Sequence, residues 1–173
     1  MAAWLICAPI GACAQKQDGL PTSAEYIAGF VRYVRWQNED RLSEWTVCVV
    51  GDLPPAQDLA YADRRVRDKP FKVRRIAEDA PLDECEVLDL TALNAPAATK
   101  LLERVRHRPI LAVGSGSSFC SSGGQICLHL AEQRNADRQK FEVNISAVRE
   151  ASLSVSARLL TLGTTRSARE DTP

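Results

Sequence analysis

The amino-acid sequence predicts a single α/β domain: a mixed, mostly parallel sheet flanked by helices, with a C-terminal antiparallel hairpin and disulfides. Helical and strand-like patterns alternate through most of the chain, which favours a parallel core. The apolar run 109–113 is typical of a strand that is covered on both faces. Two later strand-like segments, 125–130 and 140–144, are separated by polar residues and predict the hairpin.

The first predicted helix and strand follow from the spacing of apolar residues. Thr22 or Ser23 can cap a helix that runs to about Trp36. Its apolar side chains recur at helical spacing; they are Tyr26, Ile27, Phe30, Val31 and Val34. A strand is predicted over residues 45–50 and ends at a Gly-Asp turn.

The middle of the chain continues the alternation. A Pro-Pro pair at the start of 54–64 predicts a helix, since proline suits a first helical turn. Residues 71–76 alternate in polarity and predict an edge or half-exposed strand. A further strand is predicted over 85–90 and a helix over 97–106, before the central strand at 109–113.

The last third predicts the hairpin, one long helix and a tail. Polar residues 132–139 connect the two hairpin strands, which we expect at one edge of the sheet. A helical pattern covers 146–162, and the polar residues 164–173 predict a disordered tail. The predicted domain therefore spans residues 22–163.

The N-terminal residues 1–14 are uncharged and too short to span a bilayer as a helix. Ala12-Cys13-Ala14 matches the small-x-small pattern that signal peptidase cleaves. We therefore expect a signal peptide, truncated at its start, that is cleaved near Ala14. Two alternatives remain open: a lipoprotein anchored at Cys13, and an apolar segment that packs on the domain.

Removal of this leader reduces six cysteines to four: Cys48, Cys85, Cys120 and Cys127. Four cysteines allow three pairings. Pairing in sequence order, Cys48–Cys85 with Cys120–Cys127, needs no threading. The segment 119–127 supports it, because two cysteines that bracket a Ser-Ser-Gly-Gly turn have the layout of a disulfide-clipped hairpin. Four buried free thiols are the alternative, and a zinc site is disfavoured because no Cys-x-x-Cys pair is present.

Charge and motifs disfavour several functions. The chain has 22 Lys+Arg and 22 Asp+Glu, and this neutrality argues against nucleic-acid binding. The loop Gly114–Ser118 follows a strand but lacks both phosphate-binding glycine motifs, so we interpret it as a flexible connection. Cys120 with His129 is a candidate nucleophile and base, which a disulfide to Cys127 would disable. The alternation of His129 with leucines predicts an outward-facing side chain.

The other ionisable candidates have simpler interpretations. Asp83, Glu84 and Glu86 surround the start of a predicted strand and are expected to be solvated. His107 lies in a basic run at a helix C-terminus, where cations suit the helix dipole. No catalytic constellation results, so the sequence predicts a protein that is not an enzyme and has no cofactor or metal.

The order of these features resembles the YfiR family of periplasmic regulatory proteins from about residue 22 to 163. The matching blocks include Tyr33-Val34-Arg35-Trp36, the strands that carry Cys48 and Cys85, and the apolar run 110–113. They continue with Phe119-x4-Gly123-Gly124-x-Ile126, Phe141-Glu142-Val143-Asn144 and a leucine-rich helical end. Both cysteine pairs match two-disulfide members of the family. Gly114-Ser115-Gly116 and Gln37 depart from the usual pattern and put local partner contacts in doubt.

The resemblance implies a periplasmic binding protein that represses an inner-membrane diguanylate cyclase through the periplasmic region of the cyclase. An OmpA-like outer-membrane lipoprotein would relieve repression, and cyclic di-GMP, biofilm and motility would be the output. Glu142 and Asn144 are the candidate partner-binding residues; alternatively, Glu142 is solvated and Asn144 begins the last helix. The edge hairpin makes a homodimer reasonable.

Two further hypotheses concern redox and ligands. We expect Cys120–Cys127 to be an exposed, reducible clip, so that oxidation favours the repressive form, and Cys48–Cys85 to matter mainly for folding. The alternative function is a periplasmic small-ligand-binding accessory domain of a transporter or sensor kinase, with the Ser/Gly loop at its mouth. A thiol oxidoreductase is disfavoured without Cys-x-x-Cys.

Overall fold

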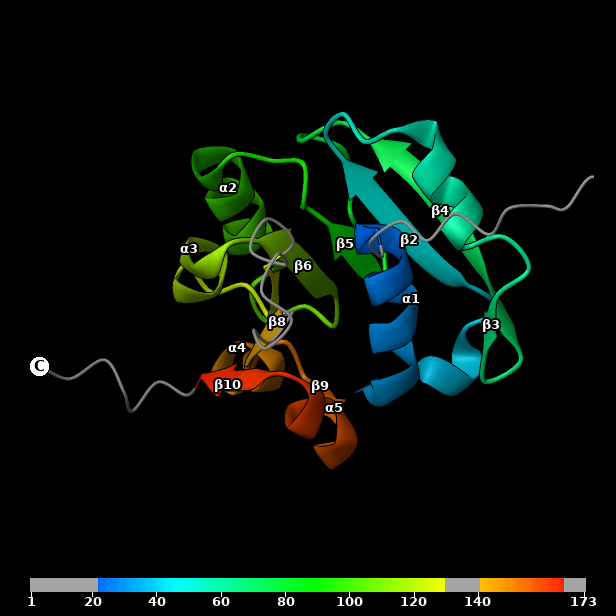
Figure 1. The fold of residues 1–173 in the computed structure, drawn as a ribbon. Helices are drawn as coiled ribbons and strands as arrows, with labels where there is room; N and C mark the ends of the chain where they lie inside the picture. Colours follow the sequence, from blue (N-terminus) through cyan, green and yellow to red (C-terminus); the bar gives the residue numbers. More distant parts are fainter. Residues whose placement is uncertain (1–21, 130–140, 167–173) are drawn as a thin grey trace, which may run out of the picture.

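The computed structural model describes residues 22–129 and 141–166, which form one α/β unit (Figure 1). The predicted signal peptide, its cleavage near Ala14 and the alternative anchor at Cys13 lie outside the described residues. So does residue 130 of the predicted strand 125–130, together with the polar connection 132–139.

An eight-stranded sheet has the order β10-β8-β7-β6-β5-β2-β4-β3. Five adjacent strands in the middle of this sheet run parallel to one another, as predicted; they are β2 (Trp45–Val50), β4 (Lys69–Ile76), β5 (Val87–Asp89), β6 (Leu111–Ser115) and β7 (Ile126–Leu128). The chain leaves β2 toward β4 and returns to β5 on the other side of β2. The carboxyl ends of β2 and β5 therefore flank the point where the strand order reverses.

Helices cover both faces of this sheet. On one face, α1 (Ser23–Tyr33) packs over a core that includes Trp45 and Val87. On the other face, α2 (Ala95–Val105) packs over a second core that includes Leu88. The fold class predicted from the sequence is confirmed.

The predicted start of the first helix is correct, but its end is not. Thr22 and Glu25 form a capping box: Thr22 Oγ1 accepts the Glu25 N–H at 3.4 Å, and Glu25 Oε2 accepts the Thr22 N–H at 2.8 Å. The predicted last turn is instead strand β1 (Val34–Trp36), which pairs antiparallel with β9 (Leu153–Val155). This pairing holds the Trp36 ring against Trp45, with ring centroids 4.9 Å apart.

The long helix predicted over 146–162 is also wrong. The chain forms α4 (Ile145–Glu150), strand β9 and α5 (Ala157–Leu162). Ser152 breaks the helix with a positive φ of 56°, and Ser156 caps α5 by accepting the Leu159 N–H at 3.4 Å. The apolar residues of the segment therefore reach the core from three short elements.

The helix predicted over 54–64 is replaced by shorter structure. A 3-10 helix, η2 (Pro55–Ala60), is followed by the two-residue strand β3 (Arg65–Val66). A tight turn joins β3 to β4, and both of its central residues have positive φ, 50° at Arg67 and 63° at Asp68. This is the geometry of a type I′ hairpin turn, which glycine and asparagine favour.

The side chain of Arg67 gives a reason for its place in this turn. Its guanidinium donates to the carbonyl oxygens of Val31 and Val34 at 3.0 and 3.3 Å, at the end of α1. It also pairs with Glu39 of the 3-10 helix η1 (Glu39–Arg41), with Nε 2.7 Å from Oε1, and lies over the Trp45 ring at 4.8 Å. The Arg67 side chain thus donates hydrogen bonds to carbonyl groups at the C-terminus of α1, which is distant in sequence.

The C-terminal hairpin is confirmed, since β7 pairs antiparallel with β8 (Phe141–Asn144). Residues predicted to begin a disordered tail instead form β10 (Thr164–Arg166), which pairs parallel with β8. Residues 167–173 lie outside the described part of the chain. Because β10 covers β8, the hairpin does not form the edge of the sheet from which a homodimer was inferred.

Candidate functional site

Both predicted disulfides are present. Cys48 of β2 is bonded to Cys85, which lies just before β5, and Cys120 is bonded to Cys127; the Cα atoms are 5.7 and 5.8 Å apart. The first bridge fastens neighbouring parts of the central sheet, as expected for a bridge that supports folding.

The second bridge does not close a hairpin, contrary to the prediction. Cys120 lies in the short helix α3 (Ser117–Ser121) and Cys127 lies in β7, so the segment is a helix, a turn and a strand. The bridge is also not exposed, because both cysteines are 0% exposed. The expectation of an exposed clip was therefore wrong: α3 lies on the sheet and encloses the sulfur atoms.

The glycines around this segment make room for one aromatic ring. A Cβ atom at Gly114 or at Gly124 would overlap the ring of Phe119, which is buried. Gly116, with a φ of 81°, begins α3. Glycine at these two positions therefore allows the backbone to pack directly against the Phe119 ring.

The candidate pair of Cys120 and His129 does not form a nucleophile and base. The Cys120 sulfur is bonded to Cys127, and the His129 side chain turns instead toward Glu142, with Nε2 4.0 Å from Oε2. The His129 side chain is only 18% exposed, so the prediction that it faces outward was wrong.

Glu142 and Asn144 both act within the protein. The Glu142 carboxylate is nearly buried and accepts from Arg166 Nε of β10 at 2.6 Å, so it is not solvated. Asn144 Oδ1 accepts the Ala147 N–H at 3.1 Å and caps α4, and its Nδ2 donates to the Cys120 carbonyl oxygen at 3.0 Å. Their contact with a partner stays a prediction.

The three carboxylates at 83–86 each contact a different partner and do not form one cluster. Asp83 and Glu84 are exposed and pair with Arg108 and Arg74. Glu86 is half-buried and accepts the backbone N–H of Thr46 at 2.8 Å, so the expectation that it is solvated was wrong. Burial raises the pKa of Glu86, and the Thr46 hydrogen bond opposes this.

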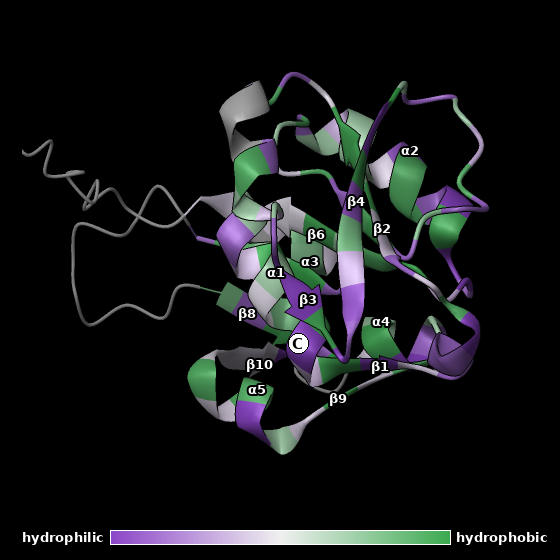
Figure 2. Cartoon of the chain, turned by 90° about the vertical axis from the view of Figure 1, so that its right-hand side faces the viewer, coloured by the Kyte–Doolittle hydropathy of each residue, from purple (hydrophilic) through white to green (hydrophobic). Residues whose placement is uncertain are grey.

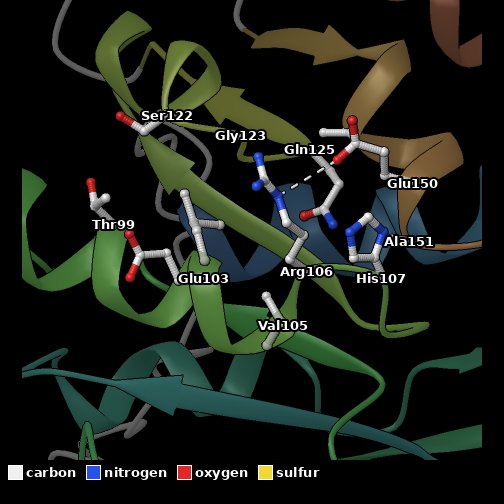
Figure 3. Close-up of a pocket in the computed structure, with 12 residues that line it drawn as sticks. Thr99, Glu103, Val105, Arg106, His107, Ser122, Gly123, Gln125, Glu150 and Ala151 are labelled. Atoms are coloured by element: carbon white, nitrogen blue, oxygen red, sulfur yellow. Dashed lines mark ion pairs between the residues drawn. The ribbon is translucent and has the colours of Figure 1, made fainter.

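A polar hollow of about 140 Å³ lies between α2, α4 and the turn into β7 (Figure 3). Arg106, His107 and Glu150 line it, and Arg106 Nε is 3.8 Å from Glu150 Oε2. Gln125 closes its floor: the buried side chain accepts the Ala112 N–H at 2.8 Å and donates to the Ile110 carbonyl at 3.3 Å. The polar groups of Gln125 are thus satisfied within the sheet.

His107 occupies a strained position at this hollow. Residues 105–108 form a type II turn, in which Arg108 N–H donates to Val105 O at 2.9 Å and His107 has a φ of 62°. Glycine is favoured there. We expect His107→Gly to raise the free energy of unfolding by about 0.5–1 kcal/mol, because the strain of the left-handed conformation disappears. Urea denaturation measures this; a loss of stability would instead show that the imidazole makes stabilising contacts.

Asp89 is a buried carboxyl group that the sequence analysis missed. It lies at the carboxyl end of β5, is 1% exposed, and accepts from the Thr91 hydroxyl at 2.7 Å and the Thr91 N–H at 3.0 Å. Burial raises the pKa of Asp89, and these hydrogen bonds oppose the shift. The sequence signal that could have identified Asp89 as buried is that it is the single acidic residue in the otherwise apolar run 87–90.

The raised pKa of Asp89 makes stability depend on pH. Between the ordinary aspartate pKa and the raised one, the folded protein binds more protons than the unfolded chain, so this contribution to stability falls as pH rises. We expect Asp89→Asn, which keeps the acceptor for Thr91, to be increasingly more stable than wild type across that window. Urea denaturation from pH 4 to 7 checks this; a constant difference would contradict it.

A more apolar hollow of about 260 Å³ lies at the amino ends of β5 and β6, whereas Asp89 lies at the carboxyl end of β5. Trp36, Leu42 and Ile110 line it, and Cys85 of the first disulfide forms part of its wall. The buried Trp36 Nε1 has no hydrogen-bond partner among the described residues. Cys85 is 4% exposed, whereas Cys48, its partner in the bridge, is 0% exposed.

Comparison with protein families shows that the chain matches the model described as YfiR/HmsC-like over residues 22–164. The chain belongs to the YfiR/HmsC-like family. At the level of the family this indicates a periplasmic, non-catalytic regulator of diguanylate cyclase. A comparison with curated proteins found no relative.

Within residues 22–129 and 141–166, no helix is both long and apolar enough to cross a membrane. In the same part of the chain, no group of three or more His, Cys, Asp and Glu side chains is placed to hold a metal ion.

Proposed function

We propose that this protein is a periplasmic repressor that binds the periplasmic region of an inner-membrane diguanylate cyclase and lowers cyclic di-GMP. The observation that carries the proposal is the family match over nearly the whole described chain. The geometry supports it, because the candidate nucleophile Cys120 is bonded to Cys127 in a disulfide. The candidate carboxylates at 83–86 likewise pair with other groups of the protein.

Release of repression is the second part of the proposal. An OmpA-like outer-membrane lipoprotein would sequester the repressor, and reduction of the repressor's disulfides would weaken repression. Cys48, Cys120 and Cys127 are 0% exposed, whereas Cys85 is 4% exposed and lines an open hollow. We therefore propose that a reductant reaches Cys85, and with it the Cys48–Cys85 bridge, before Cys120–Cys127. A homodimer stays part of the proposal.

A deletion strain tests the repressor function. We expect cyclic di-GMP and biofilm to rise on deletion and to return to the wild-type level with a plasmid copy. Crosslinking in the periplasm should recover a membrane protein with a diguanylate cyclase domain, and a lipoprotein of the OmpA type under releasing conditions. Unchanged cyclic di-GMP together with crosslinks to a permease or sensor kinase would overturn the proposal.

The alternative, a small-ligand-binding accessory domain with the Ser/Gly loop at its mouth, has little support in the geometry. The hollow lined by Ser115, Ser118 and Phe119 measures about 50 Å³. Pockets for small organic ligands usually measure several hundred Å³. The repressor therefore remains the function that we propose.

A further inference from the structure

The outer edge of β4 carries no neighbouring strand over most of its length. β3 pairs with β4 only at Pro70 and Lys69, whereas β2 pairs with the other side of β4 along residues 71–76. In a parallel pair, alternate residues direct their N–H and C=O groups away from the partner. Among the described residues, no other strand pairs with these outward groups.

Three of the six side chains along residues 71–76 are positively charged. Figure 2 shows β4 on the face nearest the viewer, with hydrophilic and hydrophobic residues along it. Lys72, Arg74 and Arg75 are 55%, 37% and 37% exposed, and they pair with Glu44, Glu84 and Asp58. Surface ion pairs of this kind contribute only about 0–1 kcal/mol, so carboxylates of a bound segment can replace or share them.

A second copy of the chain is a poor occupant of this edge. Antiparallel self-pairing centred on Val73 would place Lys72 opposite Arg74, and pairing centred on Arg74 would place Arg74 opposite its own copy. Like charges directly opposite each other are destabilising. Pro70 near the start of the strand also opposes sheet extension between copies. Self-pairing of the edge is thus disfavoured, and its three cations are held only by exposed ion pairs, which carboxylates of another protein can exchange with.

A hollow of about 410 Å³ lies beside the first residues of the edge. The rings of Tyr61 and Phe71, whose centroids are 5.5 Å apart, contribute to its lining. Two cations, Arg64 and Arg65, and two carboxylates, Asp58 and Asp63, line it as well. Arg64 is 46% exposed, and its nearest carboxylate oxygen, on Glu25, is 3.9 Å away. A segment that runs along β4 can place one side chain here, against aromatic rings and next to a weakly paired guanidinium.

We propose that residues 71–76 are the docking edge for an extended, acidic segment of a partner protein, which adds to the sheet as a further strand. Backbone hydrogen bonds would supply affinity, and Lys72, Arg74 and Arg64 would select negative charge. Only the identity of the partner rests on the proposed function, according to which it is the periplasmic region of the cyclase.

Two probes test the edge separately from the repressor function. The first is the purified periplasmic region of the cyclase, and the second is a synthetic eight-residue peptide of alternating Glu and Val. We expect both to slow hydrogen exchange of backbone amides within 71–76. We expect Lys72→Glu/Arg74→Glu to bind either probe about tenfold or more weakly than wild type, with a smaller loss for Lys72→Gln/Arg74→Gln.

Lys100→Glu/Arg158→Glu is the matched control, because it changes net charge equally at exposed helical positions away from β4. We expect it to bind like wild type. Equal weakening by the control, or protection from exchange outside 71–76, would overturn the docking edge. If the peptide binds the edge and the cyclase region does not bind at all, the proposed function fails while the docking edge stands.

Discussion

Replacing both Cys48 and Cys85 by serine is expected to lower the free energy of unfolding by about 4 kcal/mol, the larger effect of the two disulfides in the described residues. The bridge closes a sequence separation of 37 residues, and the chain-entropy model assigns about 4 kcal/mol to a loop of that length. Cys48 is fully buried, so a serine hydroxyl there adds a desolvation cost. Urea denaturation of the oxidised proteins measures the difference.

The matched control is Cys120→Ser/Cys127→Ser. Its loop has a sequence separation of 7, for which the same model gives about 2–3 kcal/mol. We also expect the Cys48→Ser/Cys85→Ser strain to show raised cyclic di-GMP, because less folded repressor remains. A Cys48→Ser protein that stays fully folded and fully repressive would contradict the structural role of this bridge.

Replacing Phe119 by alanine is expected to cost about 3–5 kcal/mol, as for other buried aromatic residues. The ring fills the space between the Gly114 and Gly124 backbones, so its removal leaves a cavity that two rigid segments cannot close. Thermal or urea unfolding measures the loss.

A double-mutant cycle between Phe119 and Gly124 tests the cause. Gly124→Ala alone should be destabilising by about 1–3 kcal/mol, since its Cβ would overlap the ring. In a Phe119→Leu background the same change should cost less, because the smaller side chain leaves room. Equal costs in the two backgrounds would show that Gly124 is required for another reason, such as its backbone conformation.

Some elements were predictable because their signals are local. The Thr22–Glu25 capping box fixes the start of α1, and the apolar run before Gly114 gives β6. Other elements depend on contacts that are distant in sequence. Val34–Trp36 fits the helical stripe, but its pairing with Leu153–Val155 outweighs the helical preference of this short stretch. The β3–β4 turn was missed because Arg-Asp is not a typical hairpin pair.

Predictions about the candidate site were likewise correct where the signal is local and wrong where it depends on contacts distant in sequence. The disulfide partners follow from order along the chain, whereas their burial depends on α3 folding onto the sheet. Glu142 was expected to be solvated or to bind a partner, because nothing in its neighbourhood indicates that Arg166 of a predicted tail returns to it. The open edge of β4 follows from strand order, which the local pattern of residues 71–76 does not contain.

The contact of Arg67 with the end of α1 has a consequence for how the N-terminal part of the protein assembles. The carbonyl oxygens of Val31 and Val34 accept hydrogen bonds from a residue more than thirty positions later in the chain. Until the β3–β4 turn is in place, only water can satisfy them. The first helix therefore gains its full stability late, together with a long-range contact, and its last turn should exchange amide protons in step with the hairpin.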